Sequence, residues 1–137
     1  IGLCMASGAK RVYGVELVES AVADAKKNMA RNNIKNAEFH LGNLDNIRDI
    51  INKLPPADVV VVDPPRAGCH KSLMKHLAAT KPKRIVYVSC NPATQVRDIL
   101  ILCELAPQFK VTSIQPVDMH PHTASCENIV TLDFVDS

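Results

Sequence analysis

Four consecutive valines, Val59–Val62, constrain the fold of this chain more than any other feature of its sequence. A strand with one solvated face alternates apolar and polar residues, whereas a strand covered on both faces is apolar throughout. Strands of the second kind are typical of parallel sheets with helices on both sides. We therefore expect these valines to form a strand that is buried on both faces of a parallel sheet.

Five further apolar runs, each bounded by turn residues, also have the composition of β-strands. With the valine run, the predicted strands cover residues 11–15, 37–41, 58–62, 84–88, 111–116 and 129–135. Helical patterns lie between most of them, and this alternation is typical of a doubly wound α/β fold. The chain has 137 residues, with no internal repeat and no linker. We therefore predict a single domain over residues 1–137.

Two of the predicted helices are well specified by their sequences. The first ends near Asn32, and its apolar face has i, i+3, i+4 spacing through Val18, Ala21, Val22, Ala25 and Met29. The second begins at Asn91, a residue type that caps helix N-termini, with Pro92 at the first helical position. We expect the apolar face of this second helix to contain Val96, Ile99, Leu100 and Cys103.

Charge, hydropathy and cysteine content exclude several classes of protein. The net charge of +2 comes from interspersed acids and bases, so a nucleic-acid partner would need a specific site or residues outside this sequence. No apolar run approaches the roughly 20 residues that span a bilayer, so we expect no membrane partner. The five cysteines contain no CxxC pair, which predicts free thiols in a reducing, intracellular compartment. Nothing indicates an oligomeric state.

Two acidic residues directly follow predicted strands, where doubly wound sheets bind their ligands. Glu16 closes the first strand, and a carboxylate there can accept hydrogen bonds from the ribose of an adenosine cofactor. The alternative is a solvated carboxylate at a strand end. Asp63 begins the segment Asp63-Pro64-Pro65-Arg66, whose prolines predict a rigid, extended turn suited to holding a substrate. The alternative is a plain connection to the next helix, with Gly68 as a breaker.

Cys90 lies between the end of a predicted strand and the N-cap residue of the next helix. The helix dipole at that place favours the thiolate, which is the nucleophilic form of cysteine. A buried structural cysteine is the usual alternative in an α/β core. The position at the ligand-binding edge of the sheet favours a functional thiol.

The segment from His120 to Glu127 precedes the last predicted strand and allows three interpretations. His120, His122 and Cys126 lack the paired spacing of known zinc motifs, so we predict no metal site. A hydrolytic pair of Cys90 and His122 is a second interpretation. In the third, Glu127 is a general base.

Three segments of this chain together resemble motifs of the RNA uracil-C5 methyltransferase family, in both order and spacing. They are Asp63-Pro64-Pro65-Arg66-Ala67-Gly68, then Ser89-Cys90-Asn91-Pro92, then His122-Thr123 followed by Glu127. The resemblance covers nearly the whole chain. It implies a Rossmann-like S-adenosylmethionine methyltransferase fold, with a mostly parallel sheet and an antiparallel C-terminal strand. It also implies an RNA substrate, either transfer or ribosomal RNA.

The resemblance also implies roles for individual residues. Cys90 would be the nucleophile and Glu127 the base that removes the C5 proton. Contacts to S-adenosylmethionine would come from Glu16, Asn43 and Asp63, while Arg66 would hold a phosphate or the uracil edge. Because C5 of uracil is a poor nucleophile, addition of a thiolate to C6 would activate it. The uridine would have to leave its stack to reach these groups.

Two features depart from the family pattern. Many members carry an aromatic residue and a second histidine where this chain has His120 and Ser125. Residues 1–3 are similar to the tail of the family's glycine-rich loop, so we expect a fragment of a longer protein that lacks the first strand. The main alternative function is a non-catalytic remnant acting as an interaction or RNA-binding module. A cytosine-C5 methyltransferase is a second alternative, but its cysteine usually follows a proline, whereas Cys90 follows Ser89. A thiol hydrolase is a third alternative, and it would not need Glu16 or Asp63.

Overall fold

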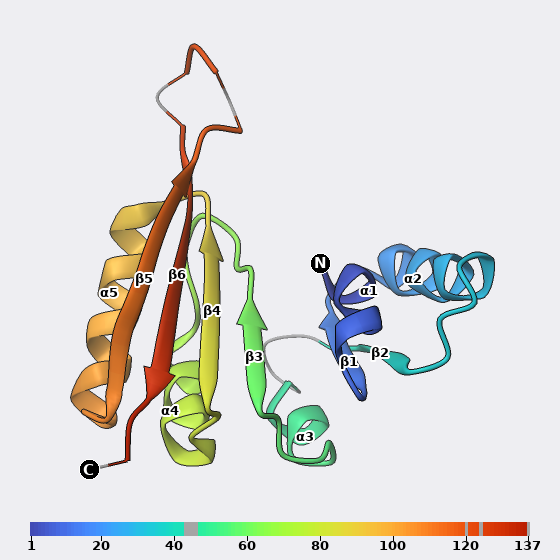
Figure 1. Ribbon diagram of the computed structural model, residues 1–137, viewed down its shortest axis with the longest axis horizontal. Helices are drawn as coiled ribbons and strands as arrows, with labels where there is room; N and C mark the ends of the chain where they lie inside the picture. Colours follow the sequence, from blue (N-terminus) through green and yellow to red (C-terminus); the bar gives the residue numbers. More distant parts are fainter. Residues whose placement is uncertain (43–46, 120, 124, 137) are drawn as a thin grey trace. The chain divides into compact units, whose positions relative to one another are not determined.

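The computed structural model describes residues 1–42, 47–119, 121–123 and 125–136. The chain divides into two compact units, Ile1–Pro55 and Pro56–Ser137, each with its own sheet. Figure 1 shows the elements of both units along the sequence. The single domain expected from chain length stays a prediction. Among the described residues, no helix is long and apolar enough to cross a membrane.

The first unit is built around a parallel pair of strands. Its elements are α1 (Gly2–Met5), a 3₁₀ turn (Ala6–Gly8), β1 (Val12–Glu16), α2 (Glu19–Arg31), β2 (Ala37–Leu41) and α3 (Ile47–Ile51). β1 and β2 pair in register from Val12 opposite Ala37 onward, as the βαβ pattern predicts. Gly14 makes room for a ring, because a Cβ there would lie 2.5 Å from the Phe39 side chain.

Helix α2 confirms the predicted element but only part of its predicted apolar face. Val22 is buried, and Ala25 and Met29 are half-buried. Val18 and Ala21 are exposed, because Val18 precedes the first helical turn and the helix packs on the sheet through its central residues. The contact face is therefore narrower than the apolar spacing indicates.

The second unit contains the larger, mixed sheet. Its elements are β3 (Val59–Val62), α4 (Lys71–Thr80), β4 (Arg84–Ser89), α5 (Pro92–Leu105), β5 (Phe109–Val117) and β6 (Glu127–Phe134). The strand order is β3-β4-β6-β5, in which β3 is parallel to β4 and β6 is antiparallel to both of its neighbours. The predicted antiparallel C-terminal strand is confirmed.

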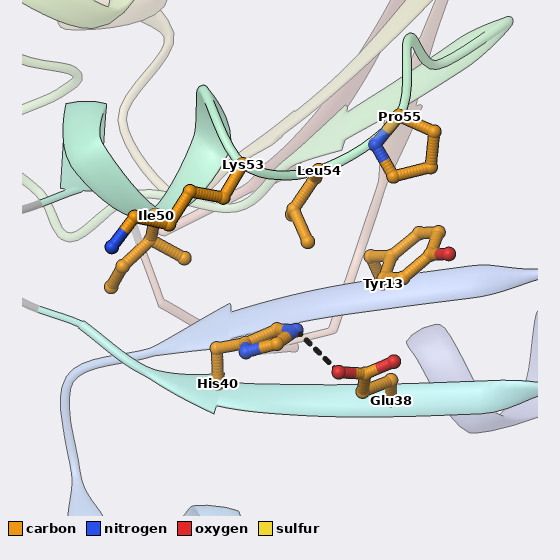
Figure 2. A pocket seen from close by; sticks show the side chains of 7 residues that line it. All are labelled: Tyr13, Glu38, His40, Ile50, Lys53, Leu54 and Pro55. Carbon is orange, nitrogen blue, oxygen red and sulfur yellow. Dashed lines mark ion pairs between the residues drawn. The ribbon is translucent and has the colours of Figure 1, made fainter.

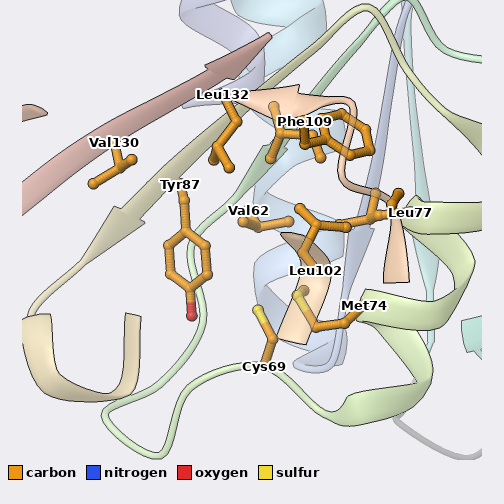
Figure 3. Packing of buried hydrophobic residues seen from close by; sticks show 11 residues of the cluster. Val62, Cys69, Met74, Leu77, Tyr87, Leu102, Phe109, Val130 and Leu132 are labelled. Atoms are coloured by element: carbon orange, nitrogen blue, oxygen red, sulfur yellow. The ribbon is translucent and has the colours of Figure 1, made fainter. Parts of the chain in front are cut away.

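One face of this sheet packs against α4 and α5 to form the main core (Figure 3). The helices contribute Met74, Leu77 and Leu102, which are at most 2% exposed. The strands contribute residues that include Ile85 and Leu132, also at most 1% exposed. Full burial of such a side chain stabilises the fold by about 1.5–3 kcal/mol. This packing holds the strands of the second unit in their order.

The structure corrects one expectation for the valine run. Val62 is buried and Val60 packs against the core, but Val59 is 51% exposed. In the described part of the second unit, both helices contribute to the same core cluster, so alternate valines point away from it. Only one face of β3 therefore packs on this core cluster, and Val61, on the same face as Val59, is half-buried, whereas the sequence predicted burial on both faces.

Candidate functional site

Cys90 lies in the turn between β4 and α5, as the sequence predicts. Asn91 is the N-cap residue of α5, and its Oδ1 accepts a hydrogen bond from the backbone N–H of Ala93 at 3.2 Å. The hydroxyl of buried Ser89 accepts from the N–H of Asn91 at 3.0 Å. These bonds fix the backbone on both sides of Cys90, which is half-buried at the start of the helix. A residue at that place lies close to the positive end of the helix dipole.

Glu127 is the first residue of β6 and is half-buried. β4 and β6 are antiparallel, and their ladder pairs Ser89 with Asn128. Cys90 directly follows Ser89 and Glu127 directly precedes Asn128, so both residues lie just beyond the last pair of this ladder. The register thus brings the predicted nucleophile and the predicted base to the same end of the sheet.

The segment that follows β3 is tied to the start of α5. Because β3 and β4 are parallel, Asp63 and Cys90 follow strands that end at the same edge of the sheet. The carbonyl oxygen of Arg66 accepts hydrogen bonds from Nδ2 of Asn91 at 3.0 Å and from Oγ1 of Thr94 at 3.2 Å. The proline-rich turn is therefore held against the helix that begins beside Cys90, the predicted nucleophile.

Arg66 also connects this turn with the segment before β6. Its Nη2 donates to the hydroxyl of Ser125 at 3.2 Å. Ser125 stands where many family members have histidine, and in this chain it is a partner of the arginine. The contact brings the three sequence motifs together at one edge of the second unit.

Asp98 anchors the same turn from inside the core and was missed by the sequence reasoning. Its side chain is 1% exposed and accepts from the N–H of Cys69 at 2.6 Å and from the hydroxyl of Tyr87 at 2.8 Å. Nη2 of Arg97 donates to it at 2.8 Å and to the carbonyl of Ala67 at the same distance. Gly68 has φ +82, and a Cβ there would lie 2.5 Å from the Asp98 carboxylate. Glycine is therefore required at this turn.

The predicted apolar face of α5 is wrong for two of its residues. Val96 and Leu100 are 56% and 57% exposed, whereas Gln95 and Asp98 are buried. Gln95, Asp98 and Leu102 also have helical spacing, and they form the buried face of α5. Polar residues are usually exposed, which is why the sequence predicted a purely apolar face. Gln95 and Asp98 can be buried because each has hydrogen-bond partners.

Cys69 is the second thiol near this edge, and burial makes it unreactive. Desolvation is the main cause that raises the pKa of Cys69 to about 11. At neutral pH this thiol is protonated and cannot compete as a nucleophile.

Of the residues expected to contact the cofactor, Glu16 is described in the first unit and Asp63 in the second. Glu16 ends β1 as predicted, and its Oε1 accepts from the N–H groups of Leu17 and Val18 at 2.7 and 3.0 Å. These bonds hold an exposed carboxylate at the carboxyl end of the strand. Asp63 is exposed directly after β3. Asn43 lies outside the described residues.

The other interpretations of residues 120–127 gain no support from contacts. His120 lies outside the described residues, and within the described ranges no group of three metal-ligating side chains could hold an ion. Cys126 donates its thiol to the carbonyl of Glu127 at 3.1 Å. His122 is exposed with φ +65, and no hydrogen bond joins it to Cys90 in the part of the chain that the structure describes.

A pocket of about 410 Å³ lies in the first unit (Figure 2). Tyr13, Glu38 and His40 line it from the two strands, and Nε2 of His40 is 3.2 Å from Oε1 of Glu38. The rest of its lining comes from residues 50–55. None of the residues predicted to bind or react is in this pocket.

Comparison with known sequences gives a consistent result. The family model described as tRNA (uracil-5-)-methyltransferase matches residues 1–134. A protein named uncharacterized RNA methyltransferase from Clostridium acetobutylicum is 48% identical over 137 residues, which are 99% of this chain and 29% of that protein. A protein of the same name from Bacteroides thetaiotaomicron is 46% identical, over 91% of this chain and 27% of that protein. The chain thus spans less than a third of these relatives.

Solved structures agree with the sequences. Pyrococcus abyssi tRNA (uracil-54, C5)-methyltransferase, solved with S-adenosyl-L-homocysteine, has a TM-score of 0.79 and 36% identity over 96% of this chain and 31% of that one. An rRNA methylase from Streptococcus thermophilus has a TM-score of 0.72 at 14% identity, over 96% of this chain and 78% of that one, which concerns the fold alone. The expected Rossmann-like methyltransferase fold is confirmed.

Proposed function

Because this chain belongs to the tRNA (uracil-5-)-methyltransferase family, we propose that it forms the catalytic part of an enzyme that methylates C5 of a uridine in transfer RNA. The observation that supports the proposal is the β4–β6 register, whose last pair, Ser89 with Asn128, directly adjoins Cys90 in one strand's exit and Glu127 in the other strand's start. The family's description and the substrate in the name of the Pyrococcus abyssi protein support transfer RNA over ribosomal RNA.

The reaction begins with Cys90 and ends with Glu127. The Cys90 thiolate adds to C6 of the uracil, forming an Sγ–C6 bond and an enolate with a nucleophilic C5. S-adenosylmethionine, when bound, would supply the methyl group: its S–CH3 bond would break as the C5–CH3 bond forms, and S-adenosylhomocysteine would leave. The Glu127 carboxylate then removes the proton from C5. The electron pair of that C–H bond restores the C5–C6 double bond and expels the Cys90 thiolate, so nucleophile and uracil are both regenerated.

The residues proposed to hold S-adenosylmethionine are Glu16, Asn43 and Asp63. The described ones fit it, because carboxylates at the carboxyl ends of strands are acceptors for ribose hydroxyls and for other donors of the cofactor. Glu16 is already oriented by the two N–H groups that follow it, and it is exposed to a ligand.

Arg66 is proposed to hold the flipped uridine or its phosphate. A target base cannot meet Cys90 while it is stacked, so the nucleotide has to be turned out and kept there. The guanidinium of Arg66 is exposed, and its 3.2 Å bond to Ser125 places it beside the segment that leads into Glu127. An arginine fork at that place suits both a phosphate and a uracil carbonyl.

The test uses the full chain, S-adenosylmethionine and transfer RNA that contains 5-fluorouridine. Fluorine at C5 cannot leave as a proton, so we expect a protein–RNA adduct that survives denaturation. Cys90→Ala and omission of S-adenosylmethionine should each abolish the adduct, and ribosomal RNA is the matched alternative substrate. If S-adenosylmethionine binds but neither RNA is trapped, the proposal is wrong and a non-catalytic remnant is favoured.

A further inference from the structure

Gln95 is a buried polar side chain that links one helix to two strands. It lies in α5 and is 1% exposed. Its Nε2 donates to the carbonyl of Tyr87 in β4 at 2.9 Å and to the carbonyl of Asn128 in β6 at 3.1 Å. Its Oε1 accepts from Nδ2 of Asn128 at 2.7 Å. The reverse amide orientation would turn an oxygen toward both carbonyls, so the network fixes the side chain.

This amide bridge, Gln95 with Asn128, lies beside both reacting groups of the proposed site. Asn128 directly follows Glu127 and pairs with Ser89, which directly precedes Cys90. Glu127 is the first residue of β6, where the ladder with β4 ends at Ser89 and Asn128. The backbone that carries Glu127 is thus held from the β4 side by the final ladder pair and by the bridge.

Cys90 is held by different bonds. The hydroxyl of Ser89 and the cap of Asn91 fix its turn, and neither bond includes Gln95 or Asn128. Loss of the bridge removes two bonds to Asn128, next to Glu127, and one to Tyr87 in β4, but it leaves both bonds that fix the turn of Cys90 in place. Proton transfer depends steeply on the distance between the base and the proton.

We propose that Gln95 and Asn128 are positioning residues that set the place of Glu127 relative to the uracil bound to Cys90. The proposal rests on the proposed uridine chemistry. Neither side chain touches the reacting atoms. The bridge acts on the removal of the C5 proton, after the Sγ–C6 bond and the new methyl bond have formed.

The test separates formation of the covalent complex from its release, using Gln95→Leu in the full chain. With 5-fluorouridine transfer RNA, adduct formation should stay within about threefold of the unsubstituted protein. With ordinary transfer RNA, turnover should fall at least about tenfold, the range expected of a misplaced base. A methylated covalent complex should then accumulate, as it should in Glu127→Gln.

Leu102→Ala is the matched control, because Leu102 is buried in the same helix but has no part in the bridge. It should lower adduct formation and turnover in parallel, without accumulation of the complex. The positioning role is wrong if Gln95→Leu lowers adduct formation and turnover in parallel, or if its turnover is normal. If the unsubstituted protein forms no adduct with 5-fluorouridine RNA, the proposed chemistry itself fails, and the positioning role fails with it.

Discussion

Cys69 and Cys90 illustrate how the surroundings of one side-chain type decide its chemistry. Cys69 is buried beside Tyr87 and Asp98, which are also buried. Cys90 has left the strand and lies at the start of α5. The sequence distinguished these two thiols by position alone, since Cys90 falls between a strand and a cap. It gave no sign that Cys69 would be enclosed, because that depends on Tyr87 of β4 and Asp98 of α5, which lie far from Cys69 in the sequence.

The raised pKa of Cys69 predicts a pH dependence of stability. The pKa of the Cys69 thiol is about 11 in the folded protein and about 8.5–9 in the unfolded chain. The thiol therefore contributes its full stability below pH 8.5–9, and this contribution is lost as the pH rises to about 11, because the unfolded chain loses its proton first. The full chain should therefore lose about 2 kcal/mol between pH 8.5 and 11 from this group. Urea unfolding of Cys69→Ala should show a smaller loss over the same range. Equal pH slopes in both proteins would contradict the assignment.

Among the elements, α5 has the largest effect on the site, because its first turns hold two other segments, the turn after β3 and the start of β6. Asn91 and Thr94 bind the carbonyl of Arg66, Arg97 binds that of Ala67, and Gln95 binds β6. The start of this helix was predictable from Asn91 and Pro92. Its inward polar face was not, because burial of polar groups depends on partners that come from distant segments.

Asn91 supports the site in two ways that substitution can separate. Asn91→Ala should destabilise the full chain by about 1 kcal/mol through loss of the helix cap. It should also slow adduct formation, because Nδ2 no longer holds Arg66. Asn91→Asp keeps an oxygen that can cap the helix but loses the donor, so it should slow the adduct at nearly unchanged stability. Thermal unfolding measures the change in stability, and 5-fluorouridine trapping measures the rate of adduct formation. If Asn91 acts only as a helix cap, Asn91→Asp will form the adduct at the same rate as the unsubstituted protein.

The strands were predicted more closely than the contacts between them. All six predicted runs became strands, since β-branched runs bounded by turn residues are a local signal. The strand order β3-β4-β6-β5 is not local, and it is this order that brings Glu127 to the same end of the sheet as Cys90. The family resemblance implied an antiparallel last strand, whereas alternation of helices and strands alone would not have placed it between two earlier ones.

At the scale of the whole molecule, the predicted functional residues are divided between the two compact units. Glu16 belongs to the first unit, and Cys90 and Glu127 belong to the second. The chain spans 29% of the length of its Clostridium acetobutylicum relative. The division into two units was not predicted, because no local pattern of the sequence encodes it.

The division predicts that cofactor affinity can be changed separately from the thiol. Glu16→Gln should weaken S-adenosylmethionine binding by about tenfold, because one charged hydrogen-bond acceptor is lost. The rate at which iodoacetamide alkylates Cys90 should not change. Glu19→Gln is the matched control, since it removes an equal charge from the exposed start of α2. Titration calorimetry measures the affinity, and unchanged binding in Glu16→Gln would remove Glu16 from the cofactor site.

The place of β6 in the sheet has a consequence for synthesis on the ribosome. β6 is made after β4 and β5, yet it lies between them, and the N–H of Phe134 at its end donates to the carbonyl of Lys83, the residue before β4. While the earlier strands emerge, the edge of β4 that will receive β6 has no partner from this sheet, and Cys90 is present without Glu127, the base proposed for it. We expect the nascent protein to hold an unfinished site until residue 134 has left the exit tunnel. Chaperones that shield open strand edges would then act on this chain during that interval.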